Sequence, residues 1–187
     1  MTPVAVDMRL RTRSADDTRA LGTALAAVLR PGDVVLLAGD LGAGKTTLTQ
    51  GMAAGLGVTD PVTSPTFTLV RSHRVDAAAG PGVRTLLHAD LYRLDRVAEV
   101  VDLGLDELVE EGAVAVVEWG DVAAPVLGPD VLVVTLSEDG APGHDVPGAP
   151  GRGRDRRDER VVVLGTEGSW ARRRPELAGR LASWVDT

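Results

Sequence analysis

The stretch VVLLA at residues 34 to 38 is followed directly by GDLGAGKT at residues 39 to 46. The first stretch is apolar without alternation, which is typical of a strand buried on both faces of a mostly parallel sheet. The second satisfies the pattern G-x-x-x-x-G-K-[ST], and a helix is predicted after it, at about residues 45 to 56. A buried strand, a glycine-rich turn and a helix in this order predict a P-loop in an α/β fold.

Each part of this pattern has a physical role in holding a nucleoside triphosphate. Glycines let backbone N–H groups converge on phosphate oxygens, and the helix N-terminus adds a favourable dipole. Lys45 would reach the β- and γ-phosphates, and the hydroxyl of Thr46 would coordinate Mg²⁺. Lys45 is the single lysine among 20 basic residues, and a compact ammonium suits a place between phosphates better than a planar guanidinium. The predicted nucleotide-binding residues are Gly39, Asp40, Leu41, Gly42, Ala43, Gly44, Lys45, Thr46 and Thr47.

Two absences in the composition favour one nucleotide and one kind of mechanism. The chain has no asparagine and no second lysine, so the N-K-x-D recognition of guanine is excluded and ATP is favoured over GTP. Its only glutamine, Gln50, lies in the helix after the glycine-rich turn, so a glutamine that orients the attacking water is not expected. A carboxylate or a hydroxyl must take that role.

Two acidic residues stand at the ends of apolar runs, Asp90 after RTLLHA and Glu118 after AVAVV. Ligands of open α/β sheets bind outside the carboxyl ends of the strands, so both acids are expected near the glycine-rich turn. Glu118 is the better candidate for a Mg²⁺ ligand, and Asp90 could polarise the attacking water or an acceptor. The alternative for each is a solvated acid at a strand end or a helix cap.

Other residues near these motifs admit two interpretations each. The segment TSPTFTL at residues 63 to 69 could be a switch-like loop that senses the γ-phosphate, or a plain turn into a strand. Trp119 could be an exposed lid or partner contact, or a packing aromatic. His88 is expected to satisfy a hydrogen bond in the core rather than to perform chemistry. Residues 172 to 174, three arginines, are interpreted as the solvated start of a helix.

Apolar runs alternate with helical stretches along the chain. Ser14 is a predicted N-cap for a first helix that PGD at residues 31 to 33 ends. Further helices are predicted at about 95–111 and 175–186, and strands at about 8–12, 34–38, 66–71, 84–88, 113–117, 131–136 and 160–164. The pattern predicts a single P-loop NTPase-like domain over residues 1–187, with a mostly parallel central sheet flanked by helices. Residues 138–159, rich in Gly, Pro and charge, are predicted to form a mobile loop between two adjacent strands.

Composition limits the partners and the metal chemistry. The formal net charge is −7 at pH 7, whereas a protein that grips nucleic acid by itself usually has a basic surface, so no DNA binding is expected. With no cysteine and three scattered histidines, any metal must be held by oxygen ligands. No stretch approaches the roughly 18 consecutive apolar residues of a membrane span, and the N-terminus lacks the pattern of a signal peptide. A cytoplasmic location without membrane contact is therefore expected.

Four segments occur together and in order: GDLGAGKTT, TSPTFTL, HADLYRL at residues 88 to 94 and VEWGD at residues 117 to 121. Together they resemble the bacterial TsaE family, also known as YjeE, the ATPase of the tRNA threonylcarbamoyladenosine pathway. The similarity runs from about residue 14 to residue 121. It implies a P-loop α/β ATPase that works with the proteins TsaD and TsaB on adenosine 37 of tRNA, with tRNA contacted indirectly through that complex. Resetting the complex through ATP binding and hydrolysis is the expected role.

The resemblance also implies roles for single residues. Lys45 would bind phosphates, Thr46 and Glu118 would hold Mg²⁺, and Asp90 would be an acid needed for hydrolysis. Three more residues are implicated, with Thr66 and Trp119 in functional loops and Ser14 near the nucleotide. The chain departs from many relatives in having Gly120, where they have proline, and in the length of the segment at 138–159.

Two other functions remain open at this stage. A small-molecule kinase could close arginines of the segment RGRDRRDER over the phosphates, namely Arg152, Arg154, Arg156 or Arg157. A non-catalytic module that senses nucleotides and binds a partner is the second alternative. The two differ from an ATPase in their products, since a kinase needs an acceptor and a sensing module needs no turnover.

Overall fold

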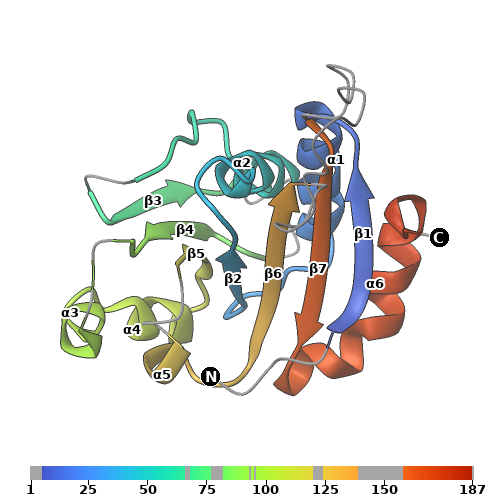
Figure 1. Cartoon of the computed structure of the whole chain (residues 1–187). Helices are drawn as coiled ribbons and strands as arrows, with labels where there is room; N and C mark the ends of the chain where they lie inside the picture. Colours follow the sequence, from blue (N-terminus) through green and yellow to red (C-terminus); the bar gives the residue numbers. More distant parts are fainter. Residues whose placement is uncertain are drawn as a thin grey trace.

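The computed structural model describes residues 6–65, 68–76, 82–92, 94, 96–119, 124–138 and 158–186. Three features singled out in the sequence lie outside these ranges, namely Thr66, Gly120 and residues 139–157 of the loop predicted at 138–159, which include the four arginines between residues 152 and 157. The described residues form one α/β fold around a seven-stranded sheet in the order β1-β7-β6-β2-β5-β4-β3 (Figure 1). The strands are β1 (Val6–Thr12), β2 (Val34–Ala38), β3 (Val70–Arg74), β4 (Thr85–Asp90), β5 (Val114–Glu118), β6 (Val131–Glu138) and β7 (Arg160–Thr166).

The sheet is mixed, so the prediction of a mostly parallel sheet is wrong. Parallel pairs join β2 to β5, β2 to β6 and β4 to β5, whereas β1–β7, β6–β7 and β3–β4 are antiparallel. Antiparallel pairing needs no long crossover connection, unlike parallel pairing, and β6 and β7, which are consecutive strands in the chain, are paired antiparallel. The parallel pairs occupy the centre, where β2 and β5 are almost wholly buried.

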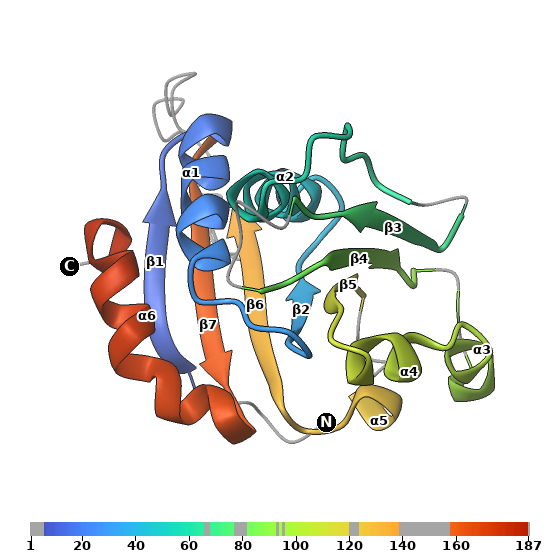
Figure 2. The ribbon, with the colours of Figure 1, turned by 180° about the vertical axis from the view of Figure 1, so that it is seen from behind.

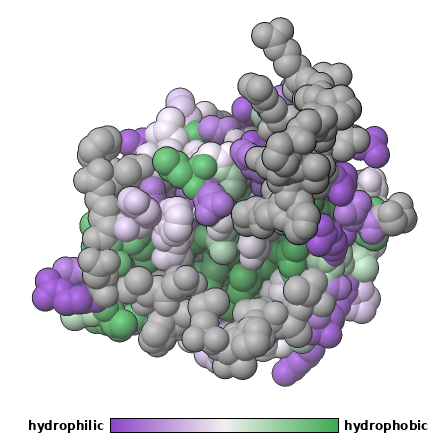
Figure 3. Space-filling model, in the orientation of Figure 1, coloured by the Kyte–Doolittle hydropathy of each residue, from purple (hydrophilic) through white to green (hydrophobic). Residues whose placement is uncertain are grey.

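Helices cover both faces of the sheet (Figures 1 and 2). One face carries α1 (Ala15–Ala26), α2 (Lys45–Leu56) and α6 (Arg174–Leu181), and the other carries α3 (Val97–Val101), α4 (Leu105–Glu110) and α5 (Ala124–Leu127). Successive side chains of β2 point to opposite faces, so Val35 and Leu37 join the first core while Val34 and Leu36 join the second. Hydrophilic side chains gather along the edge beside β1 and α6, whereas hydrophobic ones show in the middle of the face in view (Figure 3).

Small residues bring α1 and α2 into close contact. A Cβ atom on Gly51 would collide with the carbonyl oxygen of Arg19, and one on Gly22 would collide with that of Leu48. The contact therefore fixes the position of α2 against α1. Because the first turn of α2 begins at Lys45, this packing also fixes where the side chains of that turn lie.

The helix predicted at 95–111 consists of two short helices. Gly104 has φ 61°, in the left-handed region, and it separates α3 from α4. The strand predicted at 66–71 is found as β3, later in the chain, after Leu69 at φ 60°. Neither break shows in the apolar periodicity.

The three arginines at 172–174 are not a uniformly solvated helix start, which corrects their interpretation. They end the 3-10 helix η2 (Gly168–Arg173) and begin α6. Arg173 is buried, donates to both carboxylate oxygens of Asp33 at 2.8 and 2.6 Å, and lies 3.7 Å from the ring centre of Trp170. Arg174 pairs with Asp7 at 2.7 Å. Arg173, the middle residue of the three, therefore attaches the start of α6 to the loop before β2.

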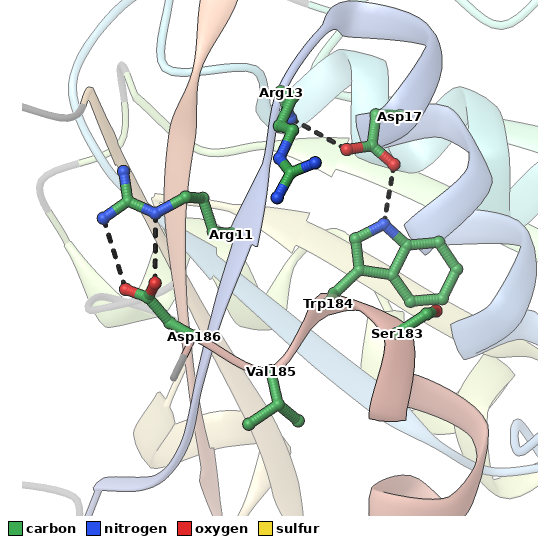
Figure 4. A pocket seen from close by; sticks show the side chains of 7 residues that line it. All are labelled: Arg11, Arg13, Asp17, Ser183, Trp184, Val185 and Asp186. Atoms are coloured by element: carbon green, nitrogen blue, oxygen red, sulfur yellow. Dashed lines mark hydrogen bonds and ion pairs between the residues drawn. The ribbon is translucent and has the colours of Figure 1, made fainter.

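The C-terminal residues attach to β1 and to the start of α1 (Figure 4). Asp186 accepts from Nε of Arg11 at 3.1 Å. The indole N–H of Trp184, at the end of the 3-10 helix η3 (Ala182–Trp184), donates to Asp17 Oδ1 at 2.7 Å, and Asp17 Oδ2 accepts from the backbone N–H of Arg13 at 2.8 Å. These contacts border a pocket of about 290 Å³. In the described part of the chain, no helix is long and apolar enough to cross a membrane.

Candidate functional site

The glycine-rich loop, residues 39–44, leaves the carboxyl end of β2 and leads into α2. Asp90, the last residue of β4, is paired in register with Glu118, the last residue of β5. Glu118 is paired in turn with Leu37 of β2. Parallel pairing of the three strands therefore places both acids at the edge of the sheet from which the loop emerges.

Glycines shape this loop. Gly39, Gly42 and Gly44 have φ values of 133°, 83° and 104°, which side chains other than glycine rarely allow. At Gly39 a Cβ atom would also collide with the carbonyl oxygen of Leu136 on β6. The loop is thus held against the neighbouring strand at a distance that only glycine permits.

Lys45 begins α2 and is almost fully buried, at 5% exposure. Its ammonium donates to the carbonyl oxygens of Gly39 at 2.8 Å and Asp40 at 3.0 Å. It also lies 4.6 Å from the ring centre of Trp119. The charge is therefore held by two dipoles of the loop and by the face of an aromatic ring, which attracts cations.

Glu118, the last residue of β5, contacts side chains from α2 and β4. Its Oε1 accepts a hydrogen bond from the hydroxyl of Thr46 on α2 at 3.0 Å and lies 2.9 Å from Nε2 of His88 on β4. Glu118 is 4% exposed and His88 is fully buried. The carboxylate is thus positioned from two sides.

Asp90 accepts two hydrogen bonds, one from a residue distant in the sequence and one from a residue close to it. Its Oδ2 accepts from the hydroxyl of Ser64 at 3.1 Å, and its Oδ1 accepts from the backbone N–H of Tyr92 at 3.2 Å. Ser64 belongs to the segment TSPTFTL, so part of the candidate switch loop contacts an acid of the site. Two hydrogen bonds from different parts of the chain fix the orientation of this carboxylate.

Two aromatic side chains border the site. Trp119 follows Glu118 with φ 61°, an uncommon value for a residue other than glycine. Its ring lies 5.0 Å from that of Tyr92, tilted by 57°. Trp119 is half-buried and Tyr92 is 64% exposed, so Trp119 both packs and borders the opening.

These groups enclose a pocket of about 560 Å³, within the range of small-molecule sites. Residues of the glycine-rich loop, of α2 and of the two strand ends line it: Leu41, Gly42, Gly44, Lys45, Thr46, Thr47, Ser64, Asp90, Tyr92, Glu118 and Trp119. Leu41 is 95% exposed at its edge. The pocket combines a buried cation, two carboxylates and backbone amides at a helix start.

Arg160, the first residue of β7, contacts the loop from outside. Its Nε donates to the carbonyl oxygen of Ala43 at 3.0 Å, and its Nη2 lies 3.4 Å from that of Gly42. Arg160 also lies 3.7 Å from Glu138 at the end of β6. Because the carbonyl oxygens are occupied by this side chain, it helps to fix the conformation of the loop.

Most of the residues predicted from the sequence come together here, but not all. Gly39 and Asp40 contribute carbonyl oxygens to Lys45, and Ala43 contributes one to Arg160. Ser14 does not line the pocket; it caps α1 by accepting from the backbone N–H of Asp17 at 3.0 Å. The prediction for Thr66 falls outside the described residues.

Tyr92 and Arg160 were missed in the sequence, and only Tyr92 carried a signal there. Tyr92 stands two residues after Asp90, the last residue of β4, within HADLYRL, so its place in that motif could have indicated it. Arg160 carries no such signal, because it stands 117 residues after Ala43 and begins a strand at the far side of the segment 138–159.

The donor chemistry fits a nucleotide-bound Mg²⁺. Within the described ranges, no group of three or more His, Cys, Asp or Glu side chains could hold a metal by itself. The hydroxyl of Thr46 and the carboxylate of Glu118 are hard oxygen donors that lie next to each other. Mg²⁺ at phosphate sites commonly takes one or two protein oxygens and completes its shell with phosphates and water, so this pair is sufficient.

A model of the family described as threonylcarbamoyl adenosine biosynthesis protein TsaE matches residues 12–145. The chain belongs to the TsaE family. The matched residues include the glycine-rich loop, Asp90 and Glu118, whereas β7 and α6 lie beyond them. Arg160 therefore lies outside the part of the chain that the family model describes.

Individual TsaE proteins agree with this assignment. The chain is 41% identical over 133 residues to tRNA threonylcarbamoyladenosine biosynthesis protein TsaE of Bacillus subtilis, covering 71% of this chain and 79% of that one. It is 49% identical over 115 residues to the protein of the same name from Streptomyces coelicolor, covering 61% and 74%. A crystal structure of Bacillus subtilis YdiB matches with a TM-score of 0.67 and 31% identity, over 97% of this chain and 98% of that one. The whole fold, including β7 and α6, thus has a counterpart.

Proposed function

We propose that this TsaE-family chain is an ATPase that binds ATP and Mg²⁺ in the pocket described above and so supports formation of N6-threonylcarbamoyladenosine in tRNA. One observation carries the proposal: Lys45, Thr46, Asp90 and Glu118, from α2, β4 and β5, line one pocket beside the glycine-rich loop. A cation, a hydroxyl and two carboxylates at a helix N-terminus are the groups needed to hold a metal-bound triphosphate.

Lys45 is the group that would change partners when the nucleotide binds. Its two carbonyl acceptors are neutral, whereas β- and γ-phosphate oxygens carry full charges and bind an ammonium more strongly. Thr46 and Glu118 would hold Mg²⁺, which neutralises charge on the phosphates. The absence of asparagine, and hence of the usual guanine-binding motif, favours ATP as the nucleotide.

Asp90 is the better candidate for orienting the attacking water. Glu118 is engaged with Thr46 and His88 through one oxygen, whereas Asp90 enters the pocket from the neighbouring strand and is oriented by Ser64 and Tyr92. A carboxylate within hydrogen-bonding reach of a water can accept its proton as the oxygen attacks the γ-phosphorus and ADP leaves. Hydrolysis by the chain alone is expected to be slow.

The proteins TsaD and TsaB are the proposed partners, and tRNA is reached through them. With a formal net charge of −7, the chain is poorly suited to hold tRNA itself. In the proposed cycle the ATP-bound form binds the TsaD/TsaB complex, and hydrolysis releases it and resets the complex for another round.

The test measures three quantities for the wild type and three variants: nucleotide affinity, phosphate release with and without TsaD and TsaB, and rounds of tRNA modification. Lys45→Ala should weaken ATP binding at least about 10-fold, because a buried charge-assisted contact is lost. Asp90→Asn should keep binding but reduce hydrolysis about 100-fold or more. Arg180→Gln, an exposed change on α6, is the matched control and should behave as wild type.

Four outcomes would contradict the proposal. If Lys45→Ala no longer binds ATP and still supports repeated rounds of modification, ATP use by this pocket is not required. If TsaD and TsaB neither alter phosphate release nor depend on this chain for multiple turnovers, the partner assignment is wrong. Transfer of phosphate to a small molecule instead of water would identify a kinase, and binding without turnover would identify a sensing module.

A further inference from the structure

His88 is the one fully buried histidine at the site, and it does not line the pocket. It lies in β4, two residues before Asp90, and is paired in register with Val116 of β5, two residues before Glu118. Side chains two residues apart on a strand share a face, so the imidazole lies directly behind the two acids. Its Nε2 is 2.9 Å from Glu118 Oε1.

The surroundings of His88 select one tautomer. Its Nδ1 is buried without a hydrogen-bond partner among the described residues. A hydrogen on Nδ1 would therefore be a buried donor without an acceptor, and Nε2 would turn a lone pair toward the carboxylate. With the hydrogen on Nε2, the ring donates to Glu118 and only an acceptor position is left unused, which costs less.

Both contacts of Glu118 fall on the same oxygen. Oε1 accepts from Thr46 at 3.0 Å and from His88, and the residue reaches the pocket wall with 4% exposure. The two donors come from different elements, α2 and β4, so the carboxylate cannot rotate without breaking one of these bonds. A fixed carboxylate loses less conformational freedom when it binds a metal ion.

We propose that His88 is a positioning residue that donates from Nε2 to Glu118 Oε1 and holds this carboxylate in the orientation that binds Mg²⁺. The inference rests on the proposed function, in which Glu118 is a metal ligand. It assigns chemistry to a side chain that the sequence suggests is only a core histidine. Groups that orient metal ligands in this way typically change metal affinity about 10- to 100-fold when removed.

The test separates metal binding from nucleotide binding. Mn²⁺ affinity of the ADP complex is measured by electron paramagnetic resonance, and ADP affinity is measured in EDTA. His88→Leu should weaken Mn²⁺ binding about 10-fold and leave ADP affinity in EDTA unchanged. His73→Leu is the matched control: it removes the other buried histidine of the β3–β4 pair, which has no hydrogen bond to Glu118, and should leave both affinities unchanged.

A second pair of variants guards against a simple loss of folding. The amide nitrogen of glutamine can occupy the place of Nε2, whereas that of asparagine is nearer the place of Nδ1. His88→Gln should therefore restore most of the Mn²⁺ affinity, and His88→Asn should not. The ¹⁵N chemical shifts of the wild-type ring should identify the tautomer with hydrogen on Nε2.

The outcomes are distinct. Equal Mn²⁺ affinity in the wild type, His88→Leu and His88→Asn would overturn the positioning role. A hydrogen on Nδ1 of the wild-type ring would overturn it as well. Neither result would contradict the proposed binding of ATP. Equal losses of Mn²⁺ affinity in His88→Gln and His88→Asn would indicate a packing role and also overturn it. A wild type that binds no nucleotide would overturn the proposed function, and this inference with it.

Discussion

The ammonium of Lys45 lies 4.6 Å from the centre of the Trp119 ring, with two carbonyl groups of the glycine-rich loop as its hydrogen-bond acceptors. The residue that would bind phosphate is thus held by its own loop and by the side chain that follows Glu118. In the proposed function, binding of a nucleotide would exchange these contacts, which would connect phosphate binding to the environment of Trp119.

The intrinsic fluorescence of Trp119 should therefore report nucleotide binding. When Lys45 moves to the phosphates, the indole loses its cation–π interaction with the ammonium, an interaction of about 0.5–2 kcal/mol. The emission of the indole should then change. The change should vanish in Trp119→Phe and persist in Trp184→Phe, whose indole donates to Asp17, whereas the ammonium of Lys45 lies over the ring of Trp119. An undiminished signal in Trp119→Phe would show that Lys45 does not exchange partners at this ring.

Arg160 should contribute to nucleotide affinity without touching the nucleotide. Arg160→Gln removes the hydrogen bonds to Gly42 and Ala43. If the loop must then be ordered when ADP binds, the binding free energy should weaken by about 1–2 kcal/mol, which corresponds to roughly 5- to 30-fold lower affinity. Calorimetric titration measures the effect, with the exposed Arg180→Gln as control. Unchanged affinity in a folded Arg160→Gln variant would show that the loop is organised without it.

The contact between α1 and α2 should not tolerate a methyl group. Gly51→Ala should lower the free energy of unfolding by about 1–3 kcal/mol, because the new Cβ overlaps the carbonyl group of Arg19. Gly179→Ala, on α6 with open space around it, should instead raise this free energy by about 0.5–1 kcal/mol through helix propensity. Urea unfolding of both variants checks the contrast, and equal effects would refute the close packing.

Stability should fall in mild acid because of His73. Burial lowers the pKa of His73 from its ordinary value of 6.5, and the nearby His88 lowers this pKa further. Asp60 raises it by less than His88 lowers it, and Arg71 has a still smaller lowering effect. The unfolded chain therefore takes up a proton near pH 6.5 that the folded chain resists, so this contribution is complete above that pH and is lost as the pH falls through it. The free energy of unfolding should fall by at most about 1.4 kcal/mol per pH unit from this group.

The measurement compares urea unfolding at pH 7.5 and 5.5. His73→Leu removes the group, so the difference between the two pH values should be smaller in this variant than in the wild type. An equal difference in both proteins would assign the acid sensitivity to other groups.

The local elements were largely predictable because their signals are local. The run at residues 34–38 coincides with β2, and the helix predicted at 45–56 coincides with α2, since a buried strand and a glycine-rich turn leave few alternatives. Strand direction was not predictable in this way. An apolar run has the same composition in parallel and antiparallel pairs, so β1, β3 and β7 were expected in a mostly parallel sheet although they pair antiparallel.

The site shows the same division. Four residues of the site could be predicted from the sequence because each belongs to a motif at the end of a strand or the start of a helix. They are Lys45, Thr46, Asp90 and Glu118. The residues that form hydrogen bonds with these groups could not be predicted from the sequence. The bond from His88 to Glu118 joins residues 30 apart, and that from Arg160 to Ala43 joins residues 117 apart.

The sequence by itself determined that this chain has a phosphate-binding loop pattern, two acids at strand ends and the segments of the TsaE family. Only the tertiary structure decided which groups hold those side chains in place. Motifs constrain neighbours along the chain, where backbone geometry acts directly. The orientation of a carboxylate or an ammonium depends on hydrogen bonds from other strands and helices, and those partners are chosen by the register of the sheet and the packing of α2 against α1.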